Sequence, residues 1–281
     1  MTLVDSTAVV VGVDSSQTAM RATLWAAEVA SRMNAPLVIA HGVMIPGWYL
    51  SEASLLASSS IAEAQDAAER LMARVRADVA DNYPDLEIHT VIKPGPADSM
   101  LIALSHKARL LVVGAHRTAS LQSLMVGSTA ALVANHATCP VVIWRPGEVR
   151  KPVVVGVDGS PLSEVAIEHA FEFANWFGTG LVAVHAWSQG RGWDEEWVGQ
   201  ENKALLSESL AGWSEKYPDV HVKSVSTAGD PRDLLSELAV DALLVVVGSH
   251  GRSRAAALIL GSVSEHLIKN APCPVMVCRN A

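Results

Sequence analysis

The sequence predicts an α/β protein made of two tandem, doubly wound domains, each a five-stranded parallel sheet flanked by helices. Three observations support this prediction. Short apolar runs alternate with longer helical patterns, the whole pattern occurs twice, and in both copies glycines follow the first and fourth apolar runs. Because crossover connections are right-handed, we expect the strand order 3-2-1-4-5 in each domain.

The duplication is visible in matched segments. The apolar run that ends at Asp14 returns 144 positions later and ends at Asp158. The run that ends at Gly114 returns only 134 positions later, at Gly248, so the second copy is ten residues shorter between these points. The seam falls near 146–148. We therefore assign the first domain to 1–147 and the second to 151–281.

The predicted strands of the first copy are short, and the first, second and fourth consist almost entirely of Val, Ile and Leu, as is typical of strands covered by helices on both faces. They span 8–13, 37–41, 87–92, 110–114 and 141–144. Between them, apolar residues recur at helical spacing, as along the face from Ala22 to Met33. The predicted helices span 18–33, 62–82, 96–106 and 120–135.

The composition limits the class of protein. The chain has 281 residues, half of them hydrophobic, and a formal charge of −8. This charge argues against a general surface for nucleic acid or an anionic membrane, although one helix N-terminus can still hold a small anion. The N-terminus lacks a basic segment followed by an apolar stretch, and no run approaches about 18 uninterrupted apolar residues. We expect a soluble, cytoplasmic protein.

The cysteines and histidines predict no metal site. The three cysteines have no CxxC spacing, and Cys139 and Cys273 each precede a proline and an apolar run, so we expect them to be buried as small hydrophobic residues in a reducing compartment. No HExxH pattern occurs. The chain also lacks the lysine-containing phosphate loop that supports rapid ATP hydrolysis.

The second copy contains a glycine pattern suited to phosphate. Gly248 ends a buried strand, Gly251 lies in the turn after it, and nine residues later Gly261 precedes Ser262 at the expected start of a helix. Glycine lets main-chain amides approach a ligand without a Cβ in the way. We expect Ser262 to cap the helix, whose first amides would hold phosphate oxygens. Two loop arginines, Arg252 and Arg254, could add charge-assisted hydrogen bonds.

This pattern, Gly248-x-x-Gly251-x9-Gly261-Ser262 after a strand that ends at Asp158, resembles the ATP-binding motif of the universal stress protein family. The whole chain is similar to a tandem-domain member of the actinobacterial type. The resemblance implies ATP as ligand and a role for the Asp158 side chain near the ribose or adenine. With the adjoining loop residues, the candidate binding residues of the second copy are Gly156, Val157, Asp158, Ala186, Gly248, Ser249, His250, Gly251, Arg252, Arg254, Gly261, Ser262, Val263 and Ser264.

The first copy keeps the nine-residue spacing but has Arg117 where the family has glycine. A Cβ there could crowd the phosphate path or forbid the required φ; alternatively, the guanidinium could itself reach a phosphate. A further alternative for both copies is that the loops serve only as tight turns between strand and helix. The candidate binding residues of the first copy are Gly12, Val13, Asp14, Gly42, Gly114, Arg117, Gly127 and Ser128.

We assign no catalytic residues. Asp14 and Asp158 are expected to contact a ligand or to hydrogen-bond beside Ser16 and Ser160, and His250 to shape its loop. The resemblance therefore implies an ATP-binding, nucleotide-dependent stress-response regulator rather than an enzyme, with Mg²⁺ as an optional companion of the triphosphate. The alternatives are a slow ATPase, an adenylyl-transferring relative, a cAMP-binding relative and a nucleotide-free interaction scaffold.

The segments 141–144 and 275–278 are predicted edge strands. Edge strands in this family pair with one another, which also protects them from unwanted association. We therefore expect the two domains to pair through these segments, with homodimerisation and an unidentified protein partner as further possibilities.

Overall fold

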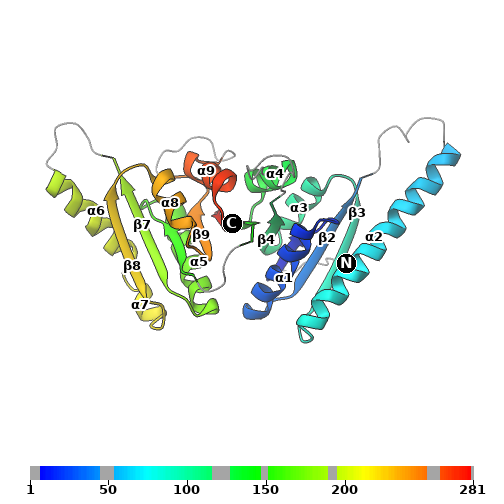
Figure 1. The fold of residues 1–281 in the computed structure, drawn as a ribbon, viewed down its shortest axis with the longest axis horizontal. Coiled ribbons are helices and arrows are strands. Elements are labelled where there is room, and N and C mark those ends of the chain that lie inside the picture. The colour runs from blue at the N-terminus through cyan, green and yellow to red at the C-terminus, as the bar shows by residue number, and fades with distance from the viewer. Residues whose placement is uncertain are drawn as a thin grey trace. The chain divides into compact units, whose positions relative to one another are not determined.

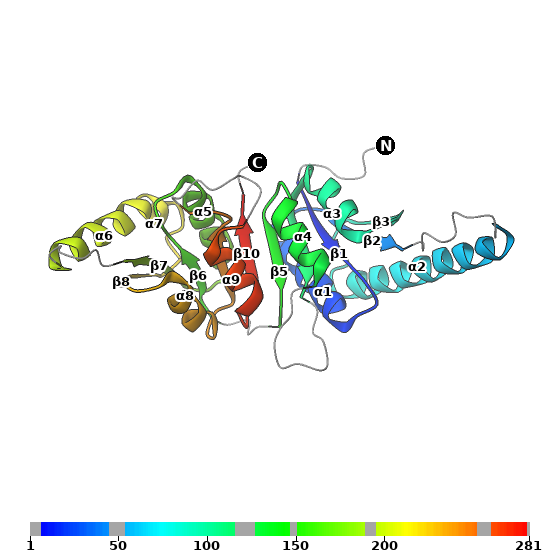
Figure 2. The same ribbon diagram turned by 90° about the horizontal axis from the view of Figure 1, so that it is seen from above.

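The computed structural model describes residues 7–44, 54–115, 127–146, 151–188, 195–251 and 260–279. These residues form two compact units. The first contains 7–44, 54–115 and 127–139, and the second contains the rest of the described chain. In each unit helices cover both faces of a mostly parallel sheet, as Figures 1 and 2 show. The predicted α/β class with two tandem domains is therefore confirmed.

The first unit has four described strands in the order β3-β2-β1-β4, all parallel. Its helix α2 begins at Ser54, earlier than the expected start at residue 62. In chain order the elements are β1 (Ala8–Gly12), α1 (Gln17–Arg32), β2 (Leu37–Val43), α2 (Ser54–Asn82), β3 (Ile88–Pro94), α3 (Ala97–Ser105), β4 (Ala108–Gly114) and α4 (Ser128–His136).

The second unit has the parallel order β8-β7-β6-β9-β10, which is the predicted 3-2-1-4-5 order. Strand order reverses at β6, which pairs with β7 on one side and β9 on the other. The elements are β5 (Val141–Trp144), β6 (Val153–Gly156), α5 (Pro161–Phe177), β7 (Leu181–Trp187), α6 (Glu195–Ser209), α7 (Trp213–Lys216), β8 (Val222–Ala228), α8 (Pro231–Ala239), β9 (Leu244–Gly248), α9 (Ser262–Asn270) and β10 (Val275–Cys278).

Strand β5 was expected to be the fifth strand of the first copy, but by its contacts it belongs to the second unit. There it pairs antiparallel with β10, with Val142 opposite Met276. All four residues of each strand are buried, so the pairing protects two apolar edges at once. The contacts thus group the described strands into four and six, while β5 follows β4 in the strand order, so that β3-β2-β1-β4-β5 is the predicted 3-2-1-4-5 order. The expected pairing of the two edge segments is confirmed.

The helix that follows the first strand starts in the same way in both units. The Ser16 hydroxyl accepts a hydrogen bond from the Ala19 amide (3.1 Å), and the Ser160 hydroxyl accepts one from the Ser163 amide (3.3 Å). Both serines are therefore N-caps, which satisfy an amide that the helix leaves without an acceptor. These caps fix where the chain turns from the strand end into the helix.

The cores of the two units differ in their aromatic content. In α5, Phe171 is fully buried and its ring stacks on Trp213 and Tyr217, with centroid separations of 5.6 and 5.7 Å. The equivalent position in α1 is Ala27, which is also fully buried. The aromatic cluster anchors α5 to α7 in the second unit.

The three cysteines are buried, as predicted. Burial raises the pKa of Cys273 to about 12 and raises that of Cys278 further. These thiols therefore remain protonated at neutral pH and pack as small apolar groups. Among the described residues, no helix combines the length and apolarity of a bilayer span.

Candidate functional site

A cavity of about 490 Å³ opens in the second unit at the carboxyl ends of β6, β7 and β9. It lies at the point of the sheet where strand order reverses, which is where open α/β sheets bind ligands, and its size suits a small molecule. Residues at the starts of α8 and α9 also line it. The structure places twelve of the fourteen candidate residues of the second copy in its wall: Gly156, Val157, Asp158, Ala186, Gly248, Ser249, His250, Gly251, Gly261, Ser262, Val263 and Ser264.

The remaining second-copy candidates, Arg252 and Arg254, lie outside the described residues, as does Arg117 of the first copy. The other first-copy candidates occupy equivalent places at the carboxyl edge of their own sheet. Gly12 and Gly114 end β1 and β4, Val13 and Asp14 follow β1, Gly42 lies near the end of β2, and Gly127 and Ser128 begin α4.

Asp158 is held in the cavity wall by local hydrogen bonding. Its Oδ1 accepts a hydrogen bond from the Ser160 amide at 3.0 Å, and Asp14 makes the same contact with the Ser16 amide at 2.9 Å. Its other oxygen, Oδ2, faces Gly251, where a Cβ would lie only 2.7 Å from it. The glycine is therefore required by the carboxylate that ends the first strand. The motif and Asp158 form one site.

A histidine whose role the sequence did not reveal connects the end of strand β6 to helix α6. His185 is buried on β7, and its Nδ1 donates to the Val157 carbonyl at 2.7 Å, one residue before Asp158. Its Nε2 lies 2.8 Å from the side-chain amide of Asn202 on α6. His41 makes the equivalent contact with Val13 at 2.8 Å. The occurrence of histidine at the same place in both copies was the signal that could have identified it.

The start of α9 supplies main-chain donors. The intrahelical ladder begins with the bond from Glu265 N to Gly261 O (2.9 Å), so the amides of Ser262, Val263 and Ser264 have no intrahelical acceptor. The prediction that Ser262 caps this helix is wrong. The N-cap is Gly261, which makes no side-chain cap bond. Ser262 is the first residue inside the helix, one position later than a cap. Such an uncapped helix start attracts anions.

The two ends of the loop before α9 are joined by hydrogen bonds. Gly261 N donates to the Ser249 carbonyl at 2.7 Å, and the Ser264 hydroxyl reaches the same carbonyl at 3.1 Å. His250 makes the local contact expected of a loop-shaping residue, with its Nδ1 2.9 Å from the Ser249 hydroxyl. Its buried Nε2 has no hydrogen-bond partner within the part of the chain that the structure describes. This arrangement sets Gly251 opposite the helix start.

Several residues that line the cavity were not predicted from the sequence. Most are apolar or small side chains that line the cavity because of packing, and only Pro231 had a recognisable signal. It follows Asp230, and an Asp–Pro pair is typical of the first residues of a helix. The missed residues are Ser160, Ser163, Val184, Pro231, Leu235, Val247 and Leu260.

Comparison with known proteins agrees with this fold. The model of the universal stress protein family matches residues 6–145 and again 150–279. A universal stress protein of Mycolicibacterium smegmatis is 36% identical over 289 residues, covering 96% of both chains. Universal stress protein Rv2005c of Mycobacterium tuberculosis is 33% identical over 298 residues, covering 97% of both. The crystal structure of a universal stress protein from Archaeoglobus fulgidus covers 99% of this chain and 97% of its own, with a TM-score of 0.70 at 17% identity.

The fold defines a tandem, doubly wound α/β protein. The chain belongs to the universal stress protein family and contains two of its domains in tandem.

Proposed function

We propose that the second domain binds ATP and that the chain is a nucleotide-dependent stress-response regulator in the cytoplasm. The observation that carries this proposal is the convergence of the α9 start and Gly251 on one cavity beside Asp158. Main-chain amides without intrahelical acceptors bind phosphate oxygens, and a carboxylate at the strand end can accept hydrogen bonds from a ribose or an adenine amino group.

The wall of the cavity supplies groups that suit both ends of a nucleotide. The amides of Ser262, Val263 and Ser264 would hold phosphates. Asp158 and apolar side chains, among them Leu235, would suit a nucleoside. A ligand with one charged end and one flat, largely apolar end fits this set of groups.

We infer a binding function rather than turnover. Among the described wall residues, Asp158 and His250 are the titratable ones, and both are engaged locally, by the Ser160 amide and the Ser249 hydroxyl. Transfer of a phosphoryl group usually requires a positioned nucleophile and several cationic groups around the transferred phosphate. The described wall contains no lysine or arginine.

The proposal is tested by measuring nucleotide in and on the purified protein. The full-length chain should release adenine nucleotide when denatured, and the nucleotide-free chain should bind ATP in calorimetry, with and without Mg²⁺. Asp158→Ala should weaken this binding, and Asp66→Ala, at an exposed position of α2, is the matched control. Absence of released nucleotide together with absence of binding would remove the proposal.

The same preparation separates the rival functions. Sustained, metal-dependent ADP release that Asp158→Ala abolishes would establish an ATPase and contradict a pure binding role. Tighter binding of cAMP than of ATP would show that cAMP is the ligand, and the proposed binding site would stand.

A further inference from the structure

A second cavity, of about 670 Å³, adjoins the first in the second unit. Both cavities are lined by Pro231, Ser262 and Val263, so they meet at the start of α9, where we place the phosphates. The second cavity also contains the turn between β8 and α8, with Asp230 and Arg232. A phosphate chain that passes the start of α9 would enter this space.

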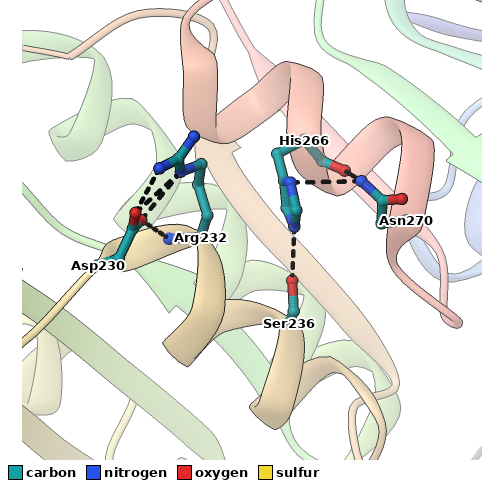
Figure 3. Close-up of polar contacts among 5 residues, drawn as sticks. All are labelled: Asp230, Arg232, Ser236, His266 and Asn270. Atoms are coloured by element: carbon teal, nitrogen blue, oxygen red, sulfur yellow. Dashed lines mark hydrogen bonds and ion pairs between the residues drawn. The ribbon is translucent and has the colours of Figure 1, made fainter.

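Among the described residues that line the second cavity, Arg232 is the cation, and in this structure Asp230 holds it. Its Nε lies 3.0 and 3.1 Å from the two carboxylate oxygens, and its Nη2 makes a further contact, as Figure 3 shows. The hydrogen bonds from Arg232 lower the pKa of Asp230 to about 2. Side-chain exposure is 47% for Arg232 and 33% for Asp230, and exposed ion pairs contribute little stability, so the guanidinium can change partners easily.

The position of this pair relative to α9 is fixed by packing. The Ser236 hydroxyl on α8 lies 3.1 Å from Nε2 of His266 on α9, and Asn270 donates to the His266 carbonyl at 2.9 Å (Figure 3). The Ser236–His266 contact connects the helix that carries Arg232 to the helix whose start faces the phosphates, and the Asn270 bond lies within α9. Asp230 in addition caps α8 by accepting from the Arg232 amide at 2.8 Å.

The first domain lacks this cation. By the offset of the repeat, the positions of Asp230 and Arg232 correspond to Pro96 and Asp98. Asp98 Oδ1 accepts from the Ser99 amide at 2.7 Å. An anion therefore replaces the guanidinium at the same place of the first domain.

We propose that Arg232 determines phosphate-chain specificity: it exchanges Asp230 for the distal phosphate of a nucleoside triphosphate whose chain extends into the second cavity. The inference rests on the proposed function. A guanidinium binds phosphate with two parallel hydrogen bonds, and a triphosphate, unlike a monophosphate or cyclic monophosphate, carries further phosphates beyond the one held at the start of α9. Asp230 competes for the same guanidinium and thereby sets how strongly a triphosphate is preferred.

The test compares ATP, AMP and cAMP binding by calorimetry in the full chain and in Arg232→Gln and Asp230→Asn. Arg232→Gln should weaken ATP binding about tenfold and leave AMP binding within about twofold, since only the longer ligand loses a charge-assisted contact. Asp230→Asn should tighten ATP binding severalfold, because asparagine still caps α8 but no longer holds the guanidinium. Lys216→Gln removes one positive charge from the exposed Glu168 ion pair and is the matched control.

The outcomes separate this inference from the function on which it depends. If wild-type protein binds ATP but Arg232→Gln weakens ATP and AMP equally, or neither, Arg232 has no specificity role and the proposed function stands. If wild-type protein binds no nucleotide, both fail. A circular-dichroism melt of each variant must show an intact fold, and the Asp230→Asn result gives an independent measure because its effect has the opposite sign.

Discussion

The two domains share the same order of strands. They differ in how closely α3 of the first domain and the equivalent α8 of the second approach the sheet. A Cβ at Gly12 would lie 2.7 Å from Cδ1 of Leu101, whereas a Cβ at Gly156 would lie 3.2 Å from Cδ1 of the equivalent Leu235. The leucine of α3 therefore packs nearer to its strand than the leucine of α8 does. In the second domain that leucine lines the cavity.

A second pair of positions shows the same difference. Gly42 in β2 has no room for a Cβ, which would lie 2.8 Å from the Cα of Ala97 at the start of α3. The equivalent positions in the second domain are Ala186 and Pro231, which both carry side chains and both line the cavity. The comparison teaches that duplicated strand ends and glycines do not by themselves produce equal sites, because the packing of one helix changes the space above them.

The largest expected effect concerns the aromatic anchor that only the second domain has. Phe171→Ala should lower the free energy of unfolding by about 3–5 kcal/mol, since the ring is fully buried and stacks on both Trp213 and Tyr217. Urea unfolding followed by tryptophan fluorescence measures it. Phe177→Ala, at a half-buried position of the same helix, should cost less. Equal losses for the two variants would show that the cluster is not an anchor.

The next prediction tests the close approach of Gly251 to the Asp158 carboxylate. Gly251→Ala should weaken ATP binding about 30-fold, or about 2 kcal/mol, because the new Cβ would lie 2.7 Å from Asp158 Oδ2 and displace the carboxylate. Calorimetry measures this change. Gly199→Ala, where the nearest contact is an ordinary 3.8 Å, is the control. Unchanged affinity in Gly251→Ala would mean that Asp158 does not contact the ligand.

The strand-end glycines should differ in stability when each is changed to alanine. A Cβ at Gly248 would lie 2.9 Å from Cβ of Leu162, whereas at Gly114 it would lie 3.3 Å from Cγ2 of Thr18. We expect losses of about 2 kcal/mol for Gly248→Ala and about 1 kcal/mol or less for Gly114→Ala, since overpacking against a rigid Cβ is harder to relieve. Thermal unfolding of both variants checks the order. The reverse order would contradict the comparison.

The smallest effect concerns the first domain, where Arg117 replaces the motif glycine. In a Gly251→Ala background, Arg117→Gly should tighten ATP binding to the remaining site about fivefold, or about 1 kcal/mol, if the arginine crowds the phosphates. Equilibrium dialysis gives both affinity and stoichiometry. Weaker binding instead would show that the guanidinium contacts a phosphate.

The sequence alone determined the duplication, the alternation of strands and helices, and twelve residues that the structure gathers around one cavity. These features could be predicted because they are local. A buried parallel strand is a short apolar run, its carboxyl end must lie at the edge of the sheet, and a glycine marks where the main chain needs space. The Asp–x–Ser turn that holds Asp158 is likewise contained in three consecutive residues.

The tertiary structure decided what depends on residues far apart in the chain. It made Gly261 rather than Ser262 the cap of α9 and set Leu101 closer to its strand than Leu235. It also brought the helix with Arg232 to the start of α9. Each of these outcomes depends on how separate elements pack against one another. That packing is set by the whole core and not by the spacing of residues along one segment.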